Sequence, residues 1–288
     1  MKTISLIIST FLITVCVYAQ TPEKILARVR YTYISKQDTL TKKSTTRSEN
    51  MLLFISKDAS LFTSYDKINH EIADEQKILA RNIAGGGMNR PRVTQIDNSV
   101  KEWMTTTNYS FFHKAKKVIV KHEFLGTGYL IEEPIPNINW KITKDTTTLS
   151  GIACQKATGN YDGKNWVAWF SPSLPFQGGP WKLHGLPGLI LEAYTDDRNT
   201  QFQFAGFEKA NDGDFVRLND TRKRPNYEPG DISNIDVSMG LDVANAYFEN
   251  KIMLSNYRTV KTTAKELENL KAAYKKDPKG FAKAMYGY

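Results

Sequence analysis

The segment from Trp166 to Glu192 most constrains what this chain can fold into. Its sequence, WVAWFSPSLPFQGGPWKLHGLPGLILE, holds three of the five tryptophans and four of the eleven prolines of the chain. Proline fixes its own φ and lacks a backbone N–H, whereas glycine accepts backbone conformations that other residues avoid. The segment therefore predicts two strands, at residues 166–170 and 189–194, joined by a rigid, irregular connection.

Two interpretations of this connection are open. In the first, residues 185–188, with sequence GLPG, form a turn that leads into a buried core strand. In the second, the connection is the lip of a binding pocket, with an aromatic lining whose shape the prolines fix. The candidate ligand-binding or partner-binding residues of this second interpretation are Trp169, Trp181 and His184.

The motifs around this connection resemble those of a known family. Residues 185–190 read GLPGLI, and they follow WKI at 140–142, GIACQKA at 151–157, AWF at 168–170 and GP at 179–180. Closely over residues 140–193, and loosely elsewhere, the chain resembles the GLPGLI family of exported proteins of Gram-negative bacteria. The resemblance implies export and no particular reaction. It also implies a structural role for the family motif, Gly185, Leu186, Pro187, Gly188, Leu189 and Ile190.

The rest of the chain predicts mainly antiparallel β structure. Alternating apolar residues indicate strands at 25–33, 93–109, 118–124 and 201–207, a hairpin of 50–56 with 61–65, and a meander after Trp140 that turns near Asp145 and at 161–163. Residues 130–136 contain two prolines and predict a connection. We expect an α+β fold with a curved sheet or half-barrel, similar to periplasmic lipoprotein carriers, and a C-terminal helical segment.

Helices are predicted mainly at the end of the chain. Thr263 and Glu266 have the spacing of a capping box, and apolar residues follow at helical spacing. Asp277 and Pro278 then predict the cap and first residue of a second helix. Looser helical patterns occur at 66–83 and 241–254, while 85–87 (GGG) and the polar stretch 211–238 predict loops.

The N-terminus predicts export. Lys2, an apolar run at 4–17 and the small residue Ala19 are typical of a signal peptide over residues 1–19. Lipid anchoring at Cys16 is not expected, because Val15 is too large for a lipidation signal. We expect a periplasmic or secreted protein, with one β-rich domain at 20–257 and a basic helical segment at 258–288.

The positive charge is uneven. The formal net charge is +9, and residues 251–288 hold nine basic and three acidic residues. Such a segment could contact anionic lipid or an acidic partner, or simply form a solvated helix face. Export argues against a nucleic-acid partner.

The sequence contains no motif for catalysis or metal binding that we can name. Cys154 would be the one cysteine of the exported protein, so no intramolecular disulfide is expected, and we predict a buried thiol. The four histidines do not form a zinc-binding pattern, so we predict no metal, no cofactor and no catalytic residue. A copper site assembled in space from a histidine with Met239, Met253 or Met285 stays open.

The sequence leaves three candidate functions open. The first is a non-enzymatic binding or carrier module for a hydrophobic ligand or for a lipidated or outer-membrane partner. The second is an accessory protein that docks on an envelope complex, through the basic C-terminal segment or through residues 211–238. The third is a hydrolase or metal-binding protein that uses His184 or His122.

Overall fold

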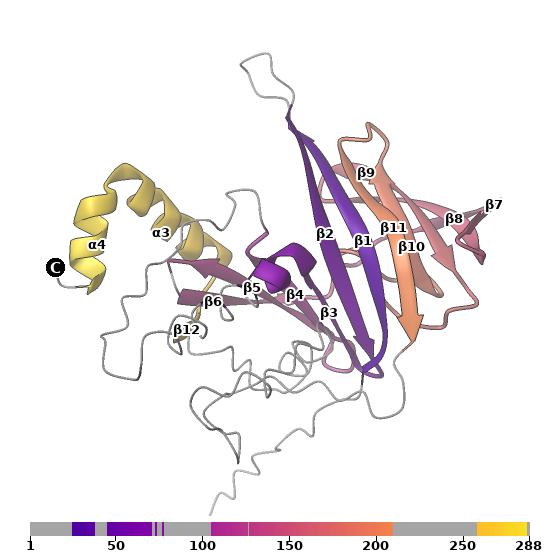
Figure 1. Cartoon of the computed structure of the whole chain (residues 1–288), viewed down its shortest axis with the longest axis horizontal. Helices are drawn as coiled ribbons and strands as arrows, with labels where there is room; N and C mark the ends of the chain where they lie inside the picture. Colours follow the sequence, from indigo (N-terminus) through magenta and orange to yellow (C-terminus); the bar gives the residue numbers. More distant parts are fainter. Residues whose placement is uncertain are drawn as a thin grey trace, which may run out of the picture.

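The strands of the protein form one open sheet. The computed structural model describes residues 25–37, 45–70, 73, 77, 105–125, 127–209 and 258–286. Twelve strands lie in the order β12-β6-β5-β4-β3-β2-β1-β11-β10-β9-β8-β7, and β12 and β7 are the two edges (Figure 1). The predicted fold class is confirmed: the sheet is mainly antiparallel, curved and not closed into a barrel, with helices at the C-terminal end.

The sheet consists of two meanders joined side by side. In each, consecutive strands pair with one another, and the antiparallel pair of β1 with β11 joins the two. The first meander comprises β1 (Ile25–Gln37), β2 (Thr45–Ser56), β3 (Ala59–Ser64), β4 (Thr107–Phe112), β5 (Lys117–Phe124) and β6 (Thr127–Pro134). The second comprises β7 (Lys141–Leu149), β8 (Ile152–Tyr161), β9 (Lys164–Ser171), β10 (Leu189–Thr195) and β11 (Thr200–Lys209).

Two local predictions about this sheet were wrong. Residues 130–134 are not a connection but belong to β6, in which Pro134 is the last strand residue and pairs with Lys117. A proline is tolerated at the end of a strand, where few ladder hydrogen bonds are lost. Asp145 is not at a turn but lies within β7, next to a register shift between Ile142 and Thr146. The polar residues there form a bulge in an edge strand instead of ending it.

The turn and strand predictions around the tryptophans were confirmed. Asp162 and Gly163 both have positive φ, 53° and 70°, as the two central residues of a tight hairpin turn require. In β10, residues 189–191 are fully buried, because the strand lies in the interior of the sheet and has both faces covered. Cys154 is a buried free thiol, and burial raises its pKa.

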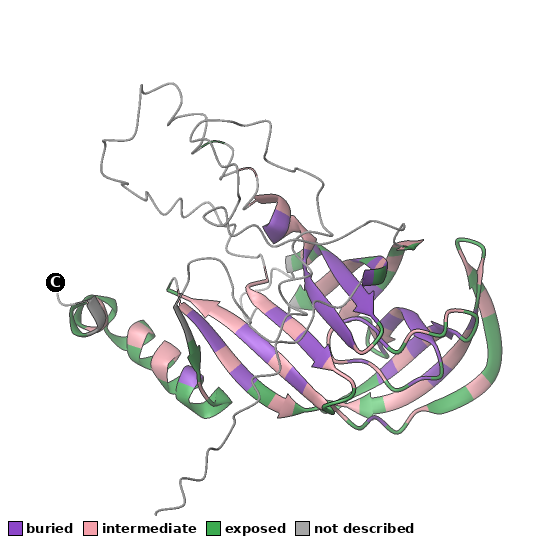
Figure 2. Ribbon diagram, turned by 90° about the horizontal axis from the view of Figure 1, so that it is seen from below, coloured by how far each residue is buried: buried purple, intermediate pink, exposed green. Residues whose placement is uncertain are grey.

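The C-terminal residues add a strand and two helices to the first meander. Strand β12 (Arg258–Lys261) pairs parallel to β6, and α3 (Ala264–Lys276) and α4 (Pro278–Tyr286) follow. The predicted capping box is present, since the Thr263 hydroxyl accepts from the Glu266 N–H while the Glu266 carboxylate accepts from the Thr263 N–H. Leu267 is the buried residue of α3, whose remaining surface is largely exposed (Figure 2).

Several predictions concern residues outside the described ones. These are the signal peptide at 1–19 with Cys16, the glycine triplet at 85–87, residues 93–104, the loop 211–238, the helix 241–254, and the methionines Met239 and Met253. Of the helix predicted at 66–83, residues 66–70, 73 and 77 are described, and they are helical. Among the described residues, no helix is long and apolar enough to cross a membrane.

Candidate functional site

Residues 172–188, here called the β9–β10 connection, fold back onto the sheet and are held there by their backbone. The Leu189 N–H donates to the Leu174 carbonyl, and the Ile190 N–H donates to the Gly178 carbonyl, both at 3.1 Å. Gly188 has φ +145°, and a Cβ on it would overlap the Ser171 carbonyl. These contacts leave the connection little conformational freedom, as its prolines and glycines predicted.

A row of alanines makes space for the connection. Ala157, Ala168 and Ala193 are cross-strand neighbours on β8, β9 and β10, and all three are fully buried. Small side chains leave a hollow above the sheet, which larger side chains from a covering segment can fill. Leu183 and Leu186 of the connection belong to the same buried cluster. The motif residue Leu186 is therefore a core residue, as expected of a structural motif.

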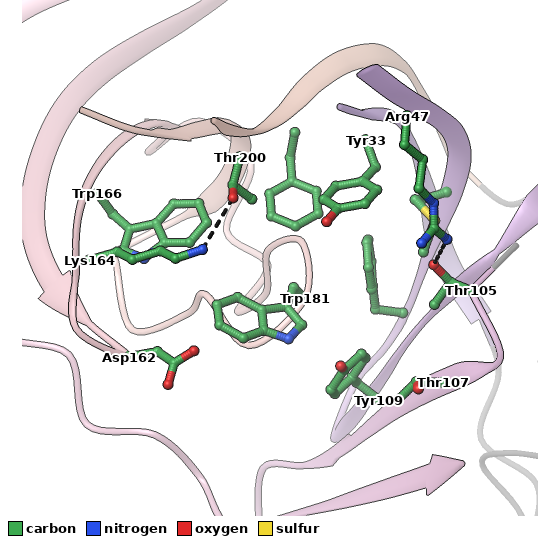
Figure 3. A pocket seen from close by; sticks show the side chains of 13 residues that line it. Tyr33, Arg47, Thr105, Thr107, Tyr109, Asp162, Lys164, Trp166, Trp181 and Thr200 are labelled. Atoms are coloured by element: carbon green, nitrogen blue, oxygen red, sulfur yellow. Dashed lines mark hydrogen bonds between the residues drawn. The ribbon is translucent and has the colours of Figure 1, made fainter. Parts of the chain in front are cut away.

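Beside this cluster, at the junction of the two meanders, the structure contains a pocket of about 270 Å³ (Figure 3). Its lining comes from β1 to β4, the turn between β8 and β9, the strands β9 and β11, and the β9–β10 connection. The lining residues are Tyr33, Arg47, Met51, Phe62, Thr105, Thr107, Tyr109, Asp162, Lys164, Trp166, Trp181, Thr200 and Phe202.

Four aromatic rings pack against one another along one side of this pocket. Trp166 and Phe202 have ring centroids 6.1 Å apart with planes at 19°, and Tyr33 stacks on Phe202 at 5.1 Å and 29°. Trp181 packs against Trp166 at 5.8 Å and 37°. Such spacings favour offset stacking. Trp166 and Phe202 are themselves buried, so the half-buried rings of Tyr33 and Trp181 offer apolar area to a ligand.

A polar network borders the opposite side of the pocket. The Glu49 carboxylate is fully buried and accepts hydrogen bonds from Arg47 Nη2 at 2.6 Å, Ser64 Oγ at 2.5 Å, and the N–H and hydroxyl of Thr105, each at 2.7 Å. Arg47 also lies 5.9 Å from the centroid of the Tyr33 ring. Because every contact satisfies a buried charge, this network fixes the Arg47 guanidinium at the pocket wall.

Tyr109 in the pocket lining and Tyr161 beside it keep their protons. Burial raises the pKa of Tyr109 to about 12, and burial likewise raises the pKa of Tyr161, which contacts Trp181, to about 12. A phenol with such a pKa stays neutral at physiological pH and can donate one hydrogen bond. The pocket therefore presents apolar rings and neutral hydroxyl groups between its charged side chains.

The three residues that the sequence predicts as ligand-binding, Trp169, Trp181 and His184, lie in different environments in the structure. Trp181 lines the pocket, whereas Trp169 does not. Trp169 packs against the main buried cluster from the other face of β9, because neighbouring strand residues alternate between faces, and Trp166 and Ala168 occupy the inner one. His184 is also absent from the pocket lining.

His184 connects the β9–β10 connection to the segment after β6 by a hydrogen bond. Its Nε2–H donates to the Pro136 carbonyl at 2.5 Å, and its ring centroid lies 5.7 Å from that of Phe111. Trp140 Nε1 donates to the His184 carbonyl at 2.8 Å. Burial lowers the pKa of His184, so the ring is neutral at pH 7. These contacts assign His184 a structural position.

The other histidine considered for chemistry also has a structural partner. His122 Nδ1 lies 2.9 Å from Thr107 Oγ1 across the β4–β5 pair, and burial lowers its pKa. Among the described residues, no group of three or more His, Cys, Asp or Glu side chains is placed to hold a metal ion.

Sequence reasoning missed most of the pocket. Tyr33 and Phe202 are 169 positions apart and become neighbours only because β1 pairs with β11. No local motif marks Arg47 or Lys164 as a pocket residue. The one local signal was the aromatic character of the strands at 25–33 and 201–207, which by itself is equally typical of core strands.

Comparisons with known proteins found a match of one family model to a short segment and a distant structural similarity. A family model described as "Protein of unknown function (Porph_ging)" matches residues 160–192, which include Trp166, Trp181 and the GLPGLI hexapeptide. No curated protein sequence matches the chain. Two solved structures of PNGF-II, in space groups P21 and C2, are similar at a TM-score of 0.46, with 12% and 10% identity. Each alignment covers 85% of this chain and 32% of the other, so this chain spans about a third of their length.

Proposed function

We propose that this protein is an exported, non-enzymatic binding module for a small hydrophobic ligand. One observation carries the proposal: aromatic rings from β1, β9, β11 and the β9–β10 connection surround one pocket of about 270 Å³. Small-molecule sites are concave and mostly apolar, and typically measure roughly 300–1,000 Å³. A pocket just below that range suits a small ligand of one or two rings.

The wall of the pocket supports a binding role because it is rigid. The backbone contacts of Gly188 and the buried alanine row hold the connection that carries Trp181. A preformed site loses little conformational freedom when a ligand enters, which favours affinity. The signal peptide predicted at residues 1–19 supports a periplasmic or secreted location for this module.

The proposal is tested by titrating the purified protein with 2-naphthol, a two-ring fluorescent probe that is neutral at pH 7. We expect Trp181→Ala to weaken binding about tenfold, because it removes one exposed wall of the pocket. Trp169→Ala is the matched control, since it removes the same side chain from the same region but outside the lining. Absence of binding, or equal weakening by both substitutions, would overturn the proposal. If the probe binds as expected, native mass spectrometry of protein purified from the cell envelope would identify a co-purified ligand.

The helical end of the chain favours a second candidate function, docking on an envelope partner. Lys265, Lys275, Lys276, Lys279 and Lys283 are exposed on α3 and α4, which lie at the β12 edge, opposite β7 (Figure 1). Deleting residues 258–288 would also remove β12 and Leu267 from the folded sheet. The sharper test replaces Lys275, Lys276 and Lys279 by Glu. Loss of crosslinks to envelope proteins, with unchanged thermal stability, is the expected result, and unchanged crosslinking would contradict it.

A further inference from the structure

The helices α3 and α4 form a strongly basic end of the molecule. Residues 264–286 contain six lysines, three acidic residues and no arginine. Among the described residues, only one of the six lysines, Lys271, has an ion pair, with Glu268 at 3.3 Å. The other five are all exposed: Lys265, Lys275, Lys276, Lys279 and Lys283. Their positive charge is therefore accessible to a partner of opposite charge.

The lysines of these helices repel one another. Lys271 and Lys275 are four residues apart on α3, and Lys279 and Lys283 are four residues apart on α4. Side chains at this spacing are neighbours on the helix surface, and like charges there destabilise a helix. An anionic surface placed against the helices would relieve this repulsion.

The carboxylates of the two helices do not balance the charge of the exposed lysines. In the capping box, Glu266 accepts from the Thr263 N–H at 2.9 Å. Asp277 accepts from the Gly280 N–H at 2.9 Å, at the start of α4. Since Glu268 pairs with Lys271, each of the three carboxylates has a local role, and positive charge predominates from the end of α3 onward.

The packing of α3 turns its outer lysines away from the sheet. Leu267 is buried and Leu270 packs beside it, so these residues define the inner face of the helix. Lys276 follows Leu267 by nine residues, which is about two and a half turns, and therefore lies on the opposite face. Lys265 and Lys276 share that face, because eleven residues make about three turns. Figure 2 shows the largely exposed surface of α3 and α4.

Aromatic contacts fix α4 to the rest of the molecule. The ring of Tyr274 packs edge-on against Phe124 of β5, with centroids 5.5 Å apart, and against Phe281 of α4, at 5.6 Å. The Phe281 ring is thereby half-buried within the protein instead of standing free to enter a lipid bilayer. Contact through this surface would therefore be electrostatic and reversible, without insertion.

From this arrangement we infer that the outer side of α3 and α4 binds the surface of an anionic lipid bilayer. Clusters of about four to eight basic residues on a helix are typical of segments that bind anionic lipid. A lysine is a hydrated point charge on a flexible stem, which suits mobile headgroups, whereas lysine is depleted at protein–protein interfaces and arginine is enriched. This inference rests on the second candidate function, docking at the envelope, and names the class of its partner.

The test is co-sedimentation of the purified protein with lipid vesicles. One set of vesicles consists of phosphatidylcholine, and the other contains added phosphatidylglycerol, which is anionic. We expect binding to the anionic vesicles and none to the neutral ones. Binding should be lost at about 1 M salt, where the Debye length is roughly 3 Å, because no apolar side chain anchors the contact.

Two triple variants of equal charge test which surface binds. The first carries Lys275→Gln, Lys276→Gln and Lys279→Gln. It should bind the anionic vesicles at least about tenfold more weakly, since each lysine near an anionic surface contributes about fivefold. It should unfold no earlier in urea than the natural protein, because it relieves like-charge pairs. The matched control removes three exposed lysines of the second meander and should bind normally: Lys141→Gln, Lys144→Gln and Lys209→Gln.

The outcomes separate this inference from the docking function. If the anionic vesicles do not bind the protein, or bind both triple variants equally, while the charge reversal of these lysines removes crosslinks to envelope proteins, the partner is a protein. The inference is then wrong and the docking function stands. If neither vesicle binding nor crosslinking depends on these lysines, both are overturned. Weaker vesicle binding in the helix variant alone supports the inference.

Discussion

The two ends of the sheet are covered in different ways. Over β8 to β11, the β9–β10 connection is fixed by backbone hydrogen bonds and by glycines without room for a side chain. It packs on a cluster of nineteen buried residues that extends to β1, β2 and β3. Over β4 to β6, α3 contributes Leu267 to a cluster of six buried residues, with Leu270 packed beside it. Backbone contacts hold the β9–β10 connection in place, whereas a few side chains hold α3. We therefore expect the connection to be the more rigid of the two.

The pocket lies where these two regions meet. Phe62 and Trp166 belong to the larger buried cluster and Trp181 packs against it, while Tyr109 of β4 packs against both clusters. The ion pair of Lys182 with Glu133 also joins the connection to β6. The difference in packing predicts that the wall formed by Trp166 and Trp181 is fixed, while β4 at Tyr109 has more freedom to adjust to a ligand.

The largest expected effect is at Gly188. Gly188→Ala places a Cβ against the Ser171 carbonyl in a backbone conformation with φ +145°, and we expect a loss of about 4 kcal/mol in the free energy of unfolding. Gly151→Ala is the control, because its φ is also positive, +84°, but no atom lies within 4 Å of the added Cβ. It should cost about 1 kcal/mol. Equal losses in urea unfolding would show that close packing does not fix the connection.

The second prediction concerns the packing of α3 on the sheet. Leu267→Ala removes the buried side chain of α3 and should destabilise its docking by about 3 kcal/mol. Amide hydrogen exchange should accelerate in residues 264–276 and stay slow in β9 and β10, since the two regions have separate buried clusters. Leu26→Ala, at an exposed position, should change neither. Faster exchange throughout β9 and β10 would mean that the sheet unfolds as one unit.

A smaller effect concerns pH and the contact between the two regions. Burial lowers the folded-state pKa of His184, so the unfolded chain takes up the proton first as the pH falls. The stability from the neutral ring is therefore complete above the ordinary pKa of about 6.5 and is lost as the pH falls through the lowered folded-state pKa. His184→Asn should flatten the pH dependence of urea unfolding between pH 7 and pH 5. His122, whose pKa burial also lowers, should contribute to the slope that remains.

The smallest effect is at the start of α3. Thr263→Ala removes the hydroxyl that accepts from the Glu266 N–H, and should cost about 1 kcal/mol of local helix stability. Thr263→Ser keeps the hydroxyl and should behave like the natural protein. Circular dichroism with hydrogen exchange of residues 264–268 measures the difference, and a substitution with no local effect would show that packing by Leu267 alone sets the helix start.

Local patterns predicted most of the secondary structure correctly. The strands around residues 166–170 and 189–194, the turn at 161–163, and the capping box of Thr263 and Glu266 each depend on a few neighbouring residues. The errors at 130–134 and at Asp145 have one cause. Proline and polar residues disfavour interior strands, but are accepted at strand ends and in bulged edge strands, and the sequence does not show which strands lie at an edge.

By itself, the sequence determined the class of fold, the rigid connection and the buried Cys154, because alternation, prolines and glycines act over short distances. Only the tertiary structure decided which aromatic side chains meet. The pairing of β1 with β11 brings Tyr33 to Phe202, and the alternation of β9 turns Trp166 inward and Trp169 away. Strand pairing between distant segments depends on the packing of the whole sheet. For that reason Trp181 was found from sequence as a candidate pocket residue, while Arg47 and Lys164 were not.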